Sequence, residues 1–189
     1  ASWSIACLGI NPEFAVSEPH ANGVVNGYQQ PEKLGVDRWL AILAASEQVD
    51  SALVVVDCGS AITVDLVTSQ GEHLGGYIAP GLRLMREALE SKTAAIKLGQ
   101  IGYPENSYPG RNTVAAIKSA ELAMIVGLVE QAKSVLKAYD MSAARLLVTG
   151  GDGEWLVAML KDGVYQEDLV LDGLHIALVS ADTQKSMSK

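Results

Sequence analysis

An acidic turn that contains a glycine is the stretch of this sequence best suited to chemistry. Residues 57–60 read Asp-Cys-Gly-Ser and stand between the apolar run 53–56 and the β-branched run 62–67. This pattern predicts two antiparallel strands joined by a tight turn. A glycine lets backbone N–H groups approach an anion, and a carboxylate can hold a cation. The turn therefore suits a cation or a phosphate group, although an aspartate that only caps its own turn would give the same pattern.

The acidic turn belongs to a run of three predicted strands, at residues 52–57, 61–68 and 73–78. Thr113 is a good N-cap for a long helix further along the chain. The other expected elements are a helix at 31–49, a helix at 82–90, a loop at 91–112, the long helix at 113–139, a strand at 145–149, a helix at 154–161, a helix at 169–179 and a solvated tail at 182–189.

This order of elements, β-β-β-α and then α-β-α, predicts an α/β fold with a mixed sheet packed against helices. The two halves of the actin-like and sugar-kinase ATPase superfold, which is ribonuclease H-like, share such an order. Each half of that superfold places an Asp-x-Gly hairpin turn against the nucleotide phosphates. One such hairpin is present here. We therefore expect an incomplete first half at residues 1–50, a second ribonuclease H-like half at 51–180 and a flexible tail at 181–189.

The composition excludes several classes of protein. Hydrophobic residues make up 49% of the 189 residues and charged residues 19%, which is typical of a folded globular chain. The formal net charge of -8 argues against a nucleic-acid partner, because no basic stripe is present to neutralise phosphates. No apolar run is long enough to span a membrane and no leader opens the chain, so we expect no membrane partner. Cys7 and Cys58 form neither a disulfide framework nor a metal cluster, and we expect a cytoplasmic protein.

Six short pieces of sequence occur in a distinctive order. They are Asn26-Gly27-Tyr28, Leu34 to Trp39, Asp57 to Ala61, His73 to Gly81, Arg111-Asn112-Thr113 and Val148 to Asp152. Each piece is weak alone, but the ordered set closely resembles the type III pantothenate kinase family, also called Bvg accessory factor-like. The resemblance extends from about residue 28 to residue 174.

The resemblance implies a reaction and its cofactors. Members of the family phosphorylate pantothenate at its primary hydroxyl with ATP, which gives phosphopantothenate in the first step of coenzyme A biosynthesis. They use a divalent metal, Mg²⁺, with ATP, and a monovalent cation, K⁺ or NH₄⁺. They also act as homodimers. Pantothenate and ATP are therefore the expected ligands.

The resemblance also implies roles for residues around the Gly-x-Asp-Arg piece. Asp37 matches the family's proton acceptor, which a hydroxyl needs when it attacks a phosphorus atom. Arg38 would hold the pantothenate carboxylate, because a guanidinium fork fits a carboxylate. Tyr28, Gly35, Val36 and Asp37 match further pantothenate contacts. Without the resemblance, Asp37 and Arg38 would read as ordinary helix-surface charges and Tyr28 as a half-buried aromatic residue.

Thr113 matches another substrate contact of the family, one that would act across a dimer interface, although it would equally serve as a helix N-cap. The helix that we expect to follow it carries a series of small residues that permit close approach of another helix. We therefore expect it to form much of a two-fold homodimer interface. These residues are Ala115, Ala116, Ala120, Ala123 and Gly127.

The acidic turn corresponds to the cation and nucleotide positions of the family. Asp57 matches the monovalent-cation position, and Gly59 and Ser60 match the ATP-contacting turn, where many relatives carry Thr in place of Ser60. Gly150 and Gly151 lie between a predicted strand and a predicted helix, so their N–H groups could approach the nucleotide. The same glycine-rich turn also occurs without a ligand.

The sequence contains two further kinds of candidate site residue. Asp65 lies on the second predicted strand and is expected to face the site, in a catalytic or a purely structural role. His20, His73 and His175 have no partners at metal-ligand spacing, so we interpret them as structural or surface residues.

One part of the family pattern is missing. The family opens with an Asp-x-Gly-Asn-[Ser/Thr] turn that grips the ATP phosphates, and residues 9–11, Gly-Ile-Asn, are the nearest equivalent here. We therefore expect either an N-terminally shortened form with little or no kinase activity by itself, or a degenerate relative. The alternative function is a non-catalytic regulatory or binding relative. The joint presence of Asp37, Arg38, Tyr28 and Thr113 favours descent from an active kinase.

Overall fold

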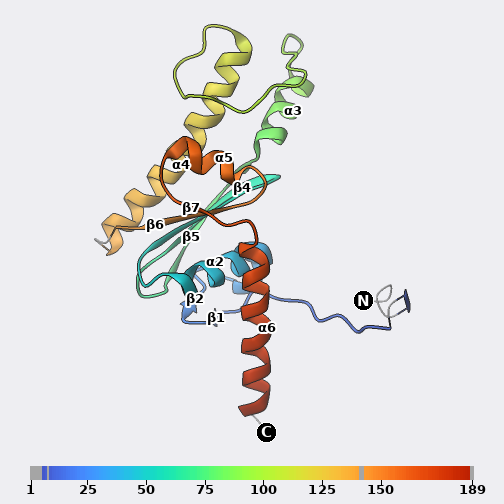
Figure 1. Ribbon diagram of the computed structural model, residues 1–189, viewed down its shortest axis with the longest axis vertical. Helices are drawn as coiled ribbons and strands as arrows, with labels where there is room; N and C mark the ends of the chain where they lie inside the picture. The colour runs from blue at the N-terminus through green and yellow to red at the C-terminus, as the bar shows by residue number, and fades with distance from the viewer. Residues whose placement is uncertain (1–5, 8, 141–142, 188–189) are drawn as a thin grey trace.

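A five-stranded mixed sheet organises the computed structural model, which describes residues 6–7, 9–140 and 143–187 (Figure 1). The strand order is β5-β4-β3-β6-β7, with β3 in the centre. Strands β3, β4 and β5 are antiparallel neighbours, whereas β6 and β7 extend the sheet in parallel with β3. The strands are β3 Leu53–Cys58, β4 Ala61–Val67, β5 His73–Pro80, β6 Arg145–Thr149 and β7 Val164–Tyr165.

A small second sheet and several helical segments surround these strands in the part of the chain that the structure describes. The small sheet pairs β1 His20–Ala21 with β2 Val24–Val25 in antiparallel register. The helical segments are the 3₁₀ turn η1 Pro31–Lys33 and the α-helices α2 Val36–Gln48, α3 Leu82–Lys92, α4 Thr113–Asp140, α5 Gly153–Leu160 and α6 Leu169–Met187.

The central strand β3 explains why the sheet is covered on both faces. Its run of aliphatic residues is buried throughout, as expected for a strand that has no solvent-facing side. Because side chains alternate along a strand, Val54 and Val56 enter one core with α4 and α5, and Leu53 and Val55 enter a second core with α2.

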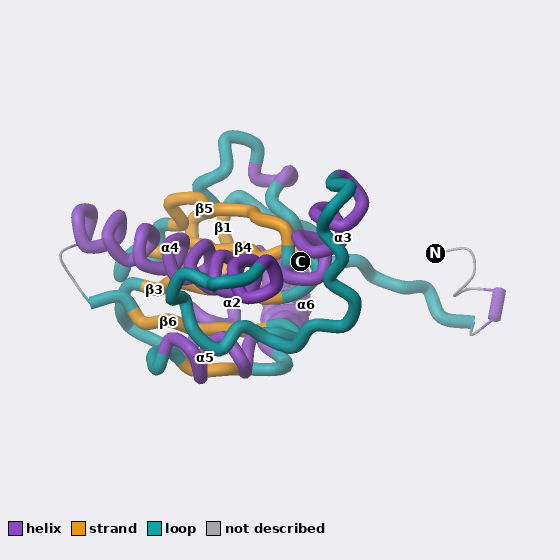
Figure 2. Tube along the Cα trace, turned by 90° about the horizontal axis from the view of Figure 1, so that it is seen from above, coloured by secondary structure: helices purple, strands orange, loops and turns teal. Residues whose placement is uncertain are grey.

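Helices cover the two faces of the sheet as the two cores require (Figures 1 and 2). Helices α2 and α6 pack together on one face, and α4 and α5 lie on the other. Helix α4 contributes a buried stripe at intervals of three and four residues, which is the period of a helix face. This stripe is Leu122, Ile125, Val129, Ala132 and Leu136.

The predicted strands at 52–57, 61–68, 73–78 and 145–149 are confirmed within one or two residues. The predicted α/β class with a mixed sheet is also confirmed. Strands β1, β2 and β7 were missed, because two-residue strands carry no periodic signal. Among the residues that the structure describes, no helix is both long and apolar enough to cross a membrane.

Three expected boundaries were wrong. The helix expected from residue 31 begins at Val36, because Gly35 and Leu34 before it have extended backbone (ψ 130° and 133°). Asn112, not Thr113, caps α4: its Oδ1 accepts a hydrogen bond from the Ala115 N–H at 2.9 Å. Helix α6 continues to Met187, so residues 182–187 of the expected tail are helical.

Candidate functional site

The first turn of α2 presents two neighbouring residues to different environments. Asp37 is exposed, and its Oδ1 accepts a hydrogen bond from the Arg38 N–H at 2.8 Å. Arg38, one position further, is buried with 5% of its side chain exposed. Gly35 precedes the helix in extended conformation. The start of α2 therefore exposes the Asp37 carboxylate to solvent and directs the Arg38 guanidinium towards the sheet.

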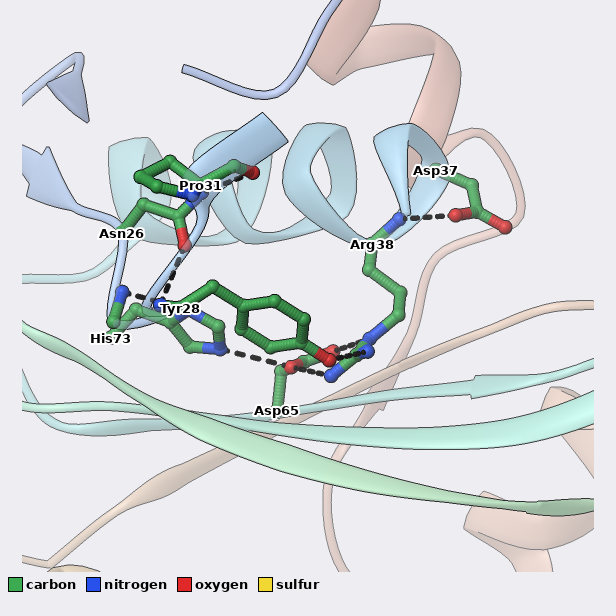
Figure 3. A network of polar contacts seen from close by, with 8 residues as sticks. Asn26, Tyr28, Pro31, Asp37, Arg38, Asp65 and His73 are labelled. Carbon is green, nitrogen blue, oxygen red and sulfur yellow. Dashed lines mark hydrogen bonds and ion pairs between the residues drawn. The ribbon is translucent and has the colours of Figure 1, made fainter. Parts of the chain in front are cut away.

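The Arg38 guanidinium meets Asp65 in a bidentate ion pair (Figure 3). Its Nε donates to Asp65 Oδ2 at 2.9 Å and its Nη2 donates to Asp65 Oδ1 at 2.5 Å. Asp65 is 2% exposed and points from β4 towards α2. Burial by itself would lower the pKa of Arg38, but the hydrogen bonds and the charge of Asp65 hold that pKa above its usual value. Arg38 therefore stays charged and fixed in place.

The close approach of this pair to strand β5 requires a glycine. Gly76 is the direct neighbour of Asp65 in the β4–β5 register. A β-carbon at Gly76 would lie 2.5 Å from Asp65 Oδ1 and 2.8 Å from Arg38 Nη2. Any side chain at this position would push the ion pair apart.

Tyr28 closes the network on the side opposite the sheet (Figure 3). Its hydroxyl accepts a hydrogen bond from Arg38 Nη1 at 2.7 Å, and its ring lies 5.5 Å from the Arg38 Cζ. Asn26 fixes the backbone here, because its Oδ1 accepts the Tyr28 N–H at 3.0 Å. An open cavity of about 520 Å³ adjoins Tyr28; the residues lining it are Gly27, Tyr28, Gln29, Gln30, Lys33, Leu74, Gly75 and Gly76.

His73 joins both halves of this network. Its Nε2 lies 3.0 Å from Asp65 Oδ1, and its Nδ1 accepts a hydrogen bond from the Gly27 N–H at 3.4 Å. The ring is buried and lies parallel to the Tyr28 ring, with 6.2 Å between the centroids. Because Nδ1 accepts a hydrogen bond from the Gly27 N–H, a neutral His73 carries its proton on Nε2, and this N–H donates a hydrogen bond to Asp65.

A second group of residues gathers around Asp57, at the end of β3. A β-carbon at Gly150 would collide with Asp57 Oδ1 and with the Cys58 carbonyl oxygen, and Gly150 has a φ of +87° that favours glycine. At Gly59 a β-carbon would lie 3.4 Å from Asp57 Oδ1. The turns after β3 and after β6 therefore meet directly at this carboxylate.

Asp57 has an electrostatically unfavourable environment. Burial raises its pKa, and the nearby negative charge of Asp37 raises it further. Neither of these two causes is a hydrogen bond or a positive charge that would favour the ionised carboxylate. A bound cation would relieve both the burial and the repulsion.

The turn after β6 continues into a further cavity. The Asp152 N–H donates to the Cys58 carbonyl at 2.9 Å, and Asp152 Oδ1 accepts a hydrogen bond from the Tyr103 hydroxyl at 2.8 Å. Asp152, Tyr103 and Arg86 line a cavity of about 590 Å³ between α3 and the loop that follows it. Burial and the charges of Asp152 and Asp57 raise the pKa of Cys58 to about 12. This thiol is therefore protonated at neutral pH and is a poor nucleophile.

No group of three or more His, Cys, Asp or Glu side chains lies at metal-binding distance within the described residues. A cation at Asp57 would therefore take its other ligands from backbone or substrate oxygens.

The structure brings most of the predicted site residues into these two neighbouring groups. Tyr28, Arg38 and Gly35 belong to the first, and Asp57, with Gly59 and Gly150, to the second. Asp37 links them, since it adjoins Arg38 in the chain and its charge acts on Asp57. Val36, Ser60 and Gly151 are solvent-exposed or partly so at the same helix start and turns.

Thr113 is the predicted residue that stands apart. It begins α4 and lines an apolar cavity of about 420 Å³ with residues of α3 and α4. Helix α4 packs on the sheet face opposite α2 and Arg38. Within one chain, Thr113 is therefore separated from the Tyr28–Arg38 group by the sheet.

Sequence reasoning missed the partners of Arg38. Asp65 was expected to face the site, but not to hold Arg38, and His73 was interpreted as a structural or surface residue without a recognised partner. The structure places His73 inside the network. The available signal is that Asp65 is the one charged residue of β4, which marks a strand position whose side chain needs a polar partner.

Comparisons with known proteins give this geometry a family context. Residues 2–134 match the family model of type III pantothenate kinase. The type III pantothenate kinase of Cellvibrio japonicus (strain Ueda107) is 43% identical over 166 residues, which cover 87% of this chain and 66% of that protein. The enzyme of the same name from Pseudomonas fluorescens (strain Pf0-1) is 37% identical over 173 residues, which cover 90% and 70% of the two chains.

A solved structure is also similar to this chain. A protein from Campylobacter jejuni, which its name places in the Baf family of transcriptional activators, superposes with a TM-score of 0.60 and 25% identity. The superposition covers 82% of this chain and 67% of that one. The chain spans about two thirds of the length of the relatives that it matches. From the family match and these identities, the chain belongs to the type III pantothenate kinase family.

Proposed function

We propose that the protein containing this chain transfers the γ-phosphoryl group of ATP to the primary hydroxyl of pantothenate. The observation that carries the proposal is the start of α2. There, an exposed carboxylate, Asp37, stands between a fixed guanidinium, Arg38, and the acidic glycine turn at Asp57. Phosphoryl transfer needs these elements side by side, because its catalysis depends on positioning and on charge stabilisation.

Asp37 is the proposed proton acceptor. Its carboxylate is exposed, so a substrate hydroxyl can reach it, and its single described hydrogen bond, from the Arg38 N–H, orients it. As the hydroxyl oxygen bonds to the γ-phosphorus, the bond between that phosphorus and the β,γ-bridging oxygen breaks, ADP leaves, and the hydroxyl proton passes to Asp37.

The proposed pantothenate site runs along Tyr28, Gly35 and Val36, with the pantothenate carboxylate towards Arg38. The Arg38 guanidinium carries five N–H groups, and the hydrogen bonds to Asp65 and Tyr28 use three of them. The N–H groups that remain, on Nη1 and Nη2, can donate to the substrate carboxylate without breaking the ion pair. The cavity of about 520 Å³ beside Tyr28 gives room for the rest of the molecule.

The proposed nucleotide site lies at the second group of residues. The backbone N–H groups of Gly59, Ser60, Gly150 and Gly151 are the proposed phosphate contacts. Asp57 is the proposed ligand of the monovalent cation, K⁺ or NH₄⁺. The cation would neutralise the Asp57 carboxylate, whose ionisation burial and Asp37 disfavour. Mg²⁺ would enter with ATP and bind mainly through phosphate oxygens, where it supplies charge stabilisation.

A second copy of the chain completes the proposal. Thr113 lies across the sheet from the pantothenate site of its own chain, so a contact with pantothenate would require Thr113 of a partner. The exposed small residues of α4 that are expected to permit such a dimer are Ala116, Ala120, Ala123 and Gly127. We also propose the actin-like superfold, with residues 1–50 and 51–180 as parts of its two halves, and a cytoplasmic location.

A coupled ADP-release assay tests the proposal on the natural gene product that contains these residues, with ATP, Mg²⁺, K⁺ and pantothenate. We expect pantothenate-dependent ADP release. The same assay on the 189-residue chain is expected to give little or no turnover, because the sequence offers no first phosphate-binding turn. If the natural gene product also releases no ADP, the hypothesis of a non-catalytic regulatory relative replaces the kinase hypothesis. The names of the curated relatives favour the kinase.

A further inference from the structure

The buried network around Arg38 contains two residues to which the proposed reaction assigns no role, Asp65 and His73. Both are nearly inaccessible: Asp65 is 2% exposed and the His73 side chain 0%. A buried carboxylate and a buried imidazole are expensive to retain unless each is satisfied. Here each makes contacts to a different part of the pantothenate site.

The contacts form one chain of hydrogen bonds across the site. Arg38 donates twice to Asp65, Asp65 accepts from His73 Nε2, and His73 Nδ1 accepts from the Gly27 N–H. Gly27 directly precedes Tyr28, and the Tyr28 hydroxyl accepts a hydrogen bond from Arg38 Nη1. The result is a closed ring that begins and ends at the guanidinium.

This ring has a consequence for substrate recognition. Arg38 has a long side chain, and an exposed arginine loses considerable rotamer freedom when it binds a ligand. The bidentate contact with Asp65 removes that freedom before the ligand arrives, and the contact of His73 with Gly27 does the same for the segment that carries Tyr28. Preorganisation of this kind strengthens binding without a new contact to the ligand.

We propose that Asp65 and His73 are positioning residues of the pantothenate site. Asp65 fixes the Arg38 guanidinium, and His73 couples Asp65 to the backbone that carries Tyr28. Neither residue touches the substrate. The inference rests on the proposed function for the identity of the ligand, but the ring of hydrogen bonds does not depend on it.

The two ring nitrogens of His73 allow the two couplings to be separated. His73→Gln can place an amide N–H near the position of Nε2 and so keeps the donor to Asp65, whereas His73→Asn can place a polar atom near Nδ1 and keeps the acceptor for Gly27. His73→Leu removes both. His175→Leu, at an exposed position of α6, is the matched control.

Two measurements on the 189-residue chain test the proposal. The first is NMR, read at the Arg38 Nε–H signal and at the hydrogen-exchange protection of the Gly27 N–H; the second is pantothenate affinity by calorimetry. We expect His73→Gln to preserve the Arg38 signal and to reduce the Gly27 protection, and His73→Asn to do the reverse. We expect His73→Leu to change both and to weaken pantothenate binding roughly 3- to 10-fold, the effect of one hydrogen bond.

The control distinguishes positioning from general stabilisation. Under the proposal, His175→Leu leaves both signals and the affinity unchanged, and the His73 variants lose affinity at temperatures where thermal melting shows them folded. The proposal is overturned if His73→Leu, folded, keeps the parental Arg38 signal, the parental protection of the Gly27 N–H and the parental affinity. If the parent chain does not bind pantothenate, the proposed substrate fails, and the NMR signals alone then decide whether the ring positions Arg38 and Tyr28.

Discussion

The two groups of residues that meet at the start of α2 differ in how their charges are balanced. Around Arg38, each charge has a buried partner of opposite sign or a hydrogen bond within 3.4 Å. Around Asp57, burial and a second carboxylate, Asp37, oppose ionisation, and the described residues supply no counter-charge. The first group is preorganised by the protein itself. The second keeps an uncompensated carboxylate, and it is where the proposed cation and phosphates would bind.

The comparison explains why Asp37 and Arg38, adjacent in sequence, suit different tasks. Arg38 is held by Asp65 and can present a fixed charge to a substrate. Asp37 faces solvent beside Asp57, so its carboxylate is free to accept a proton. The first turn of α2 thus joins the rigid group around Arg38 to the group around Asp57, which lacks a counter-charge among the described residues.

The largest expected effect comes from the residue that links the two groups. Asp37→Asn keeps the shape and the hydrogen bond to the Arg38 N–H but removes the proton acceptor. In the active gene product, turnover should fall by roughly 10²–10⁴-fold, with pantothenate affinity largely retained. Steady-state kinetics and calorimetry together check this. Near-parental turnover would show that proton transfer does not depend on Asp37.

The second-largest effect is expected when the Arg38–Asp65 ion pair of the first group is broken. Arg38→Ala leaves Asp65 buried without its cation, and His73 is then its one remaining described partner. Removal of one member of a buried ion pair typically costs about 3–5 kcal/mol of unfolding free energy. Denaturant unfolding should show a loss of this order. Pantothenate affinity of the folded variant should also fall, by about 1.5–3 kcal/mol for a charge-assisted hydrogen bond.

A smaller effect tests whether a second copy of the chain completes the proposed pantothenate site. Ala120 is exposed on α4, so Ala120→Glu should leave the fold intact, but it would place like charges near each other across a two-fold interface. We expect the parent chain to sediment as a dimer at micromolar concentration and the variant as a monomer. Lys133→Glu, which changes charge nearer the other end of α4, is the comparison variant. A monomeric parent would contradict the dimer proposal.

The smallest effect concerns stability and pH at Asp57. Because burial and Asp37 raise the folded-state pKa of Asp57, its ionisation costs the folded state free energy at pH values above that pKa. Asp57→Asn removes this cost, so the Tm of the ligand-free chain should rise slightly at neutral pH. The gain should disappear as the pH falls below the ordinary aspartate pKa of about 4.

Thermal melting with and without K⁺ sharpens this last test. A cation bound by Asp57 should stabilise the parent chain and not Asp57→Asn. Asp50→Asn, in the turn before β3, is a control carboxylate, and it should not show the difference with K⁺. A parent and variant with equal Tm at every pH would show that Asp57 carries no such penalty.

The sequence by itself determined the strands and the order of the motifs. The run at 53–56, the turn at 57–60 and the β-branched run after it carry their own periodicity and turn chemistry, so each is readable from nearby residues. The start of α2 at Val36 was not readable in this way, because a 3₁₀ turn at Pro31–Lys33 resembles a first helical turn in its spacing. Local sequence signals therefore predict which helices and strands form more reliably than the residues at which they begin and end.

Tertiary structure alone decided which of these residues meet. Arg38 and Asp65 are 27 positions apart, and Gly150 reaches Asp57 from a strand that is parallel to β3 and far along the chain. Strand parity says that Asp65 faces one side of the sheet, but not that α2 covers that side. The packing of α2 on one face and α4 on the other makes that choice, since the apolar side chains of β3 must be buried on both faces.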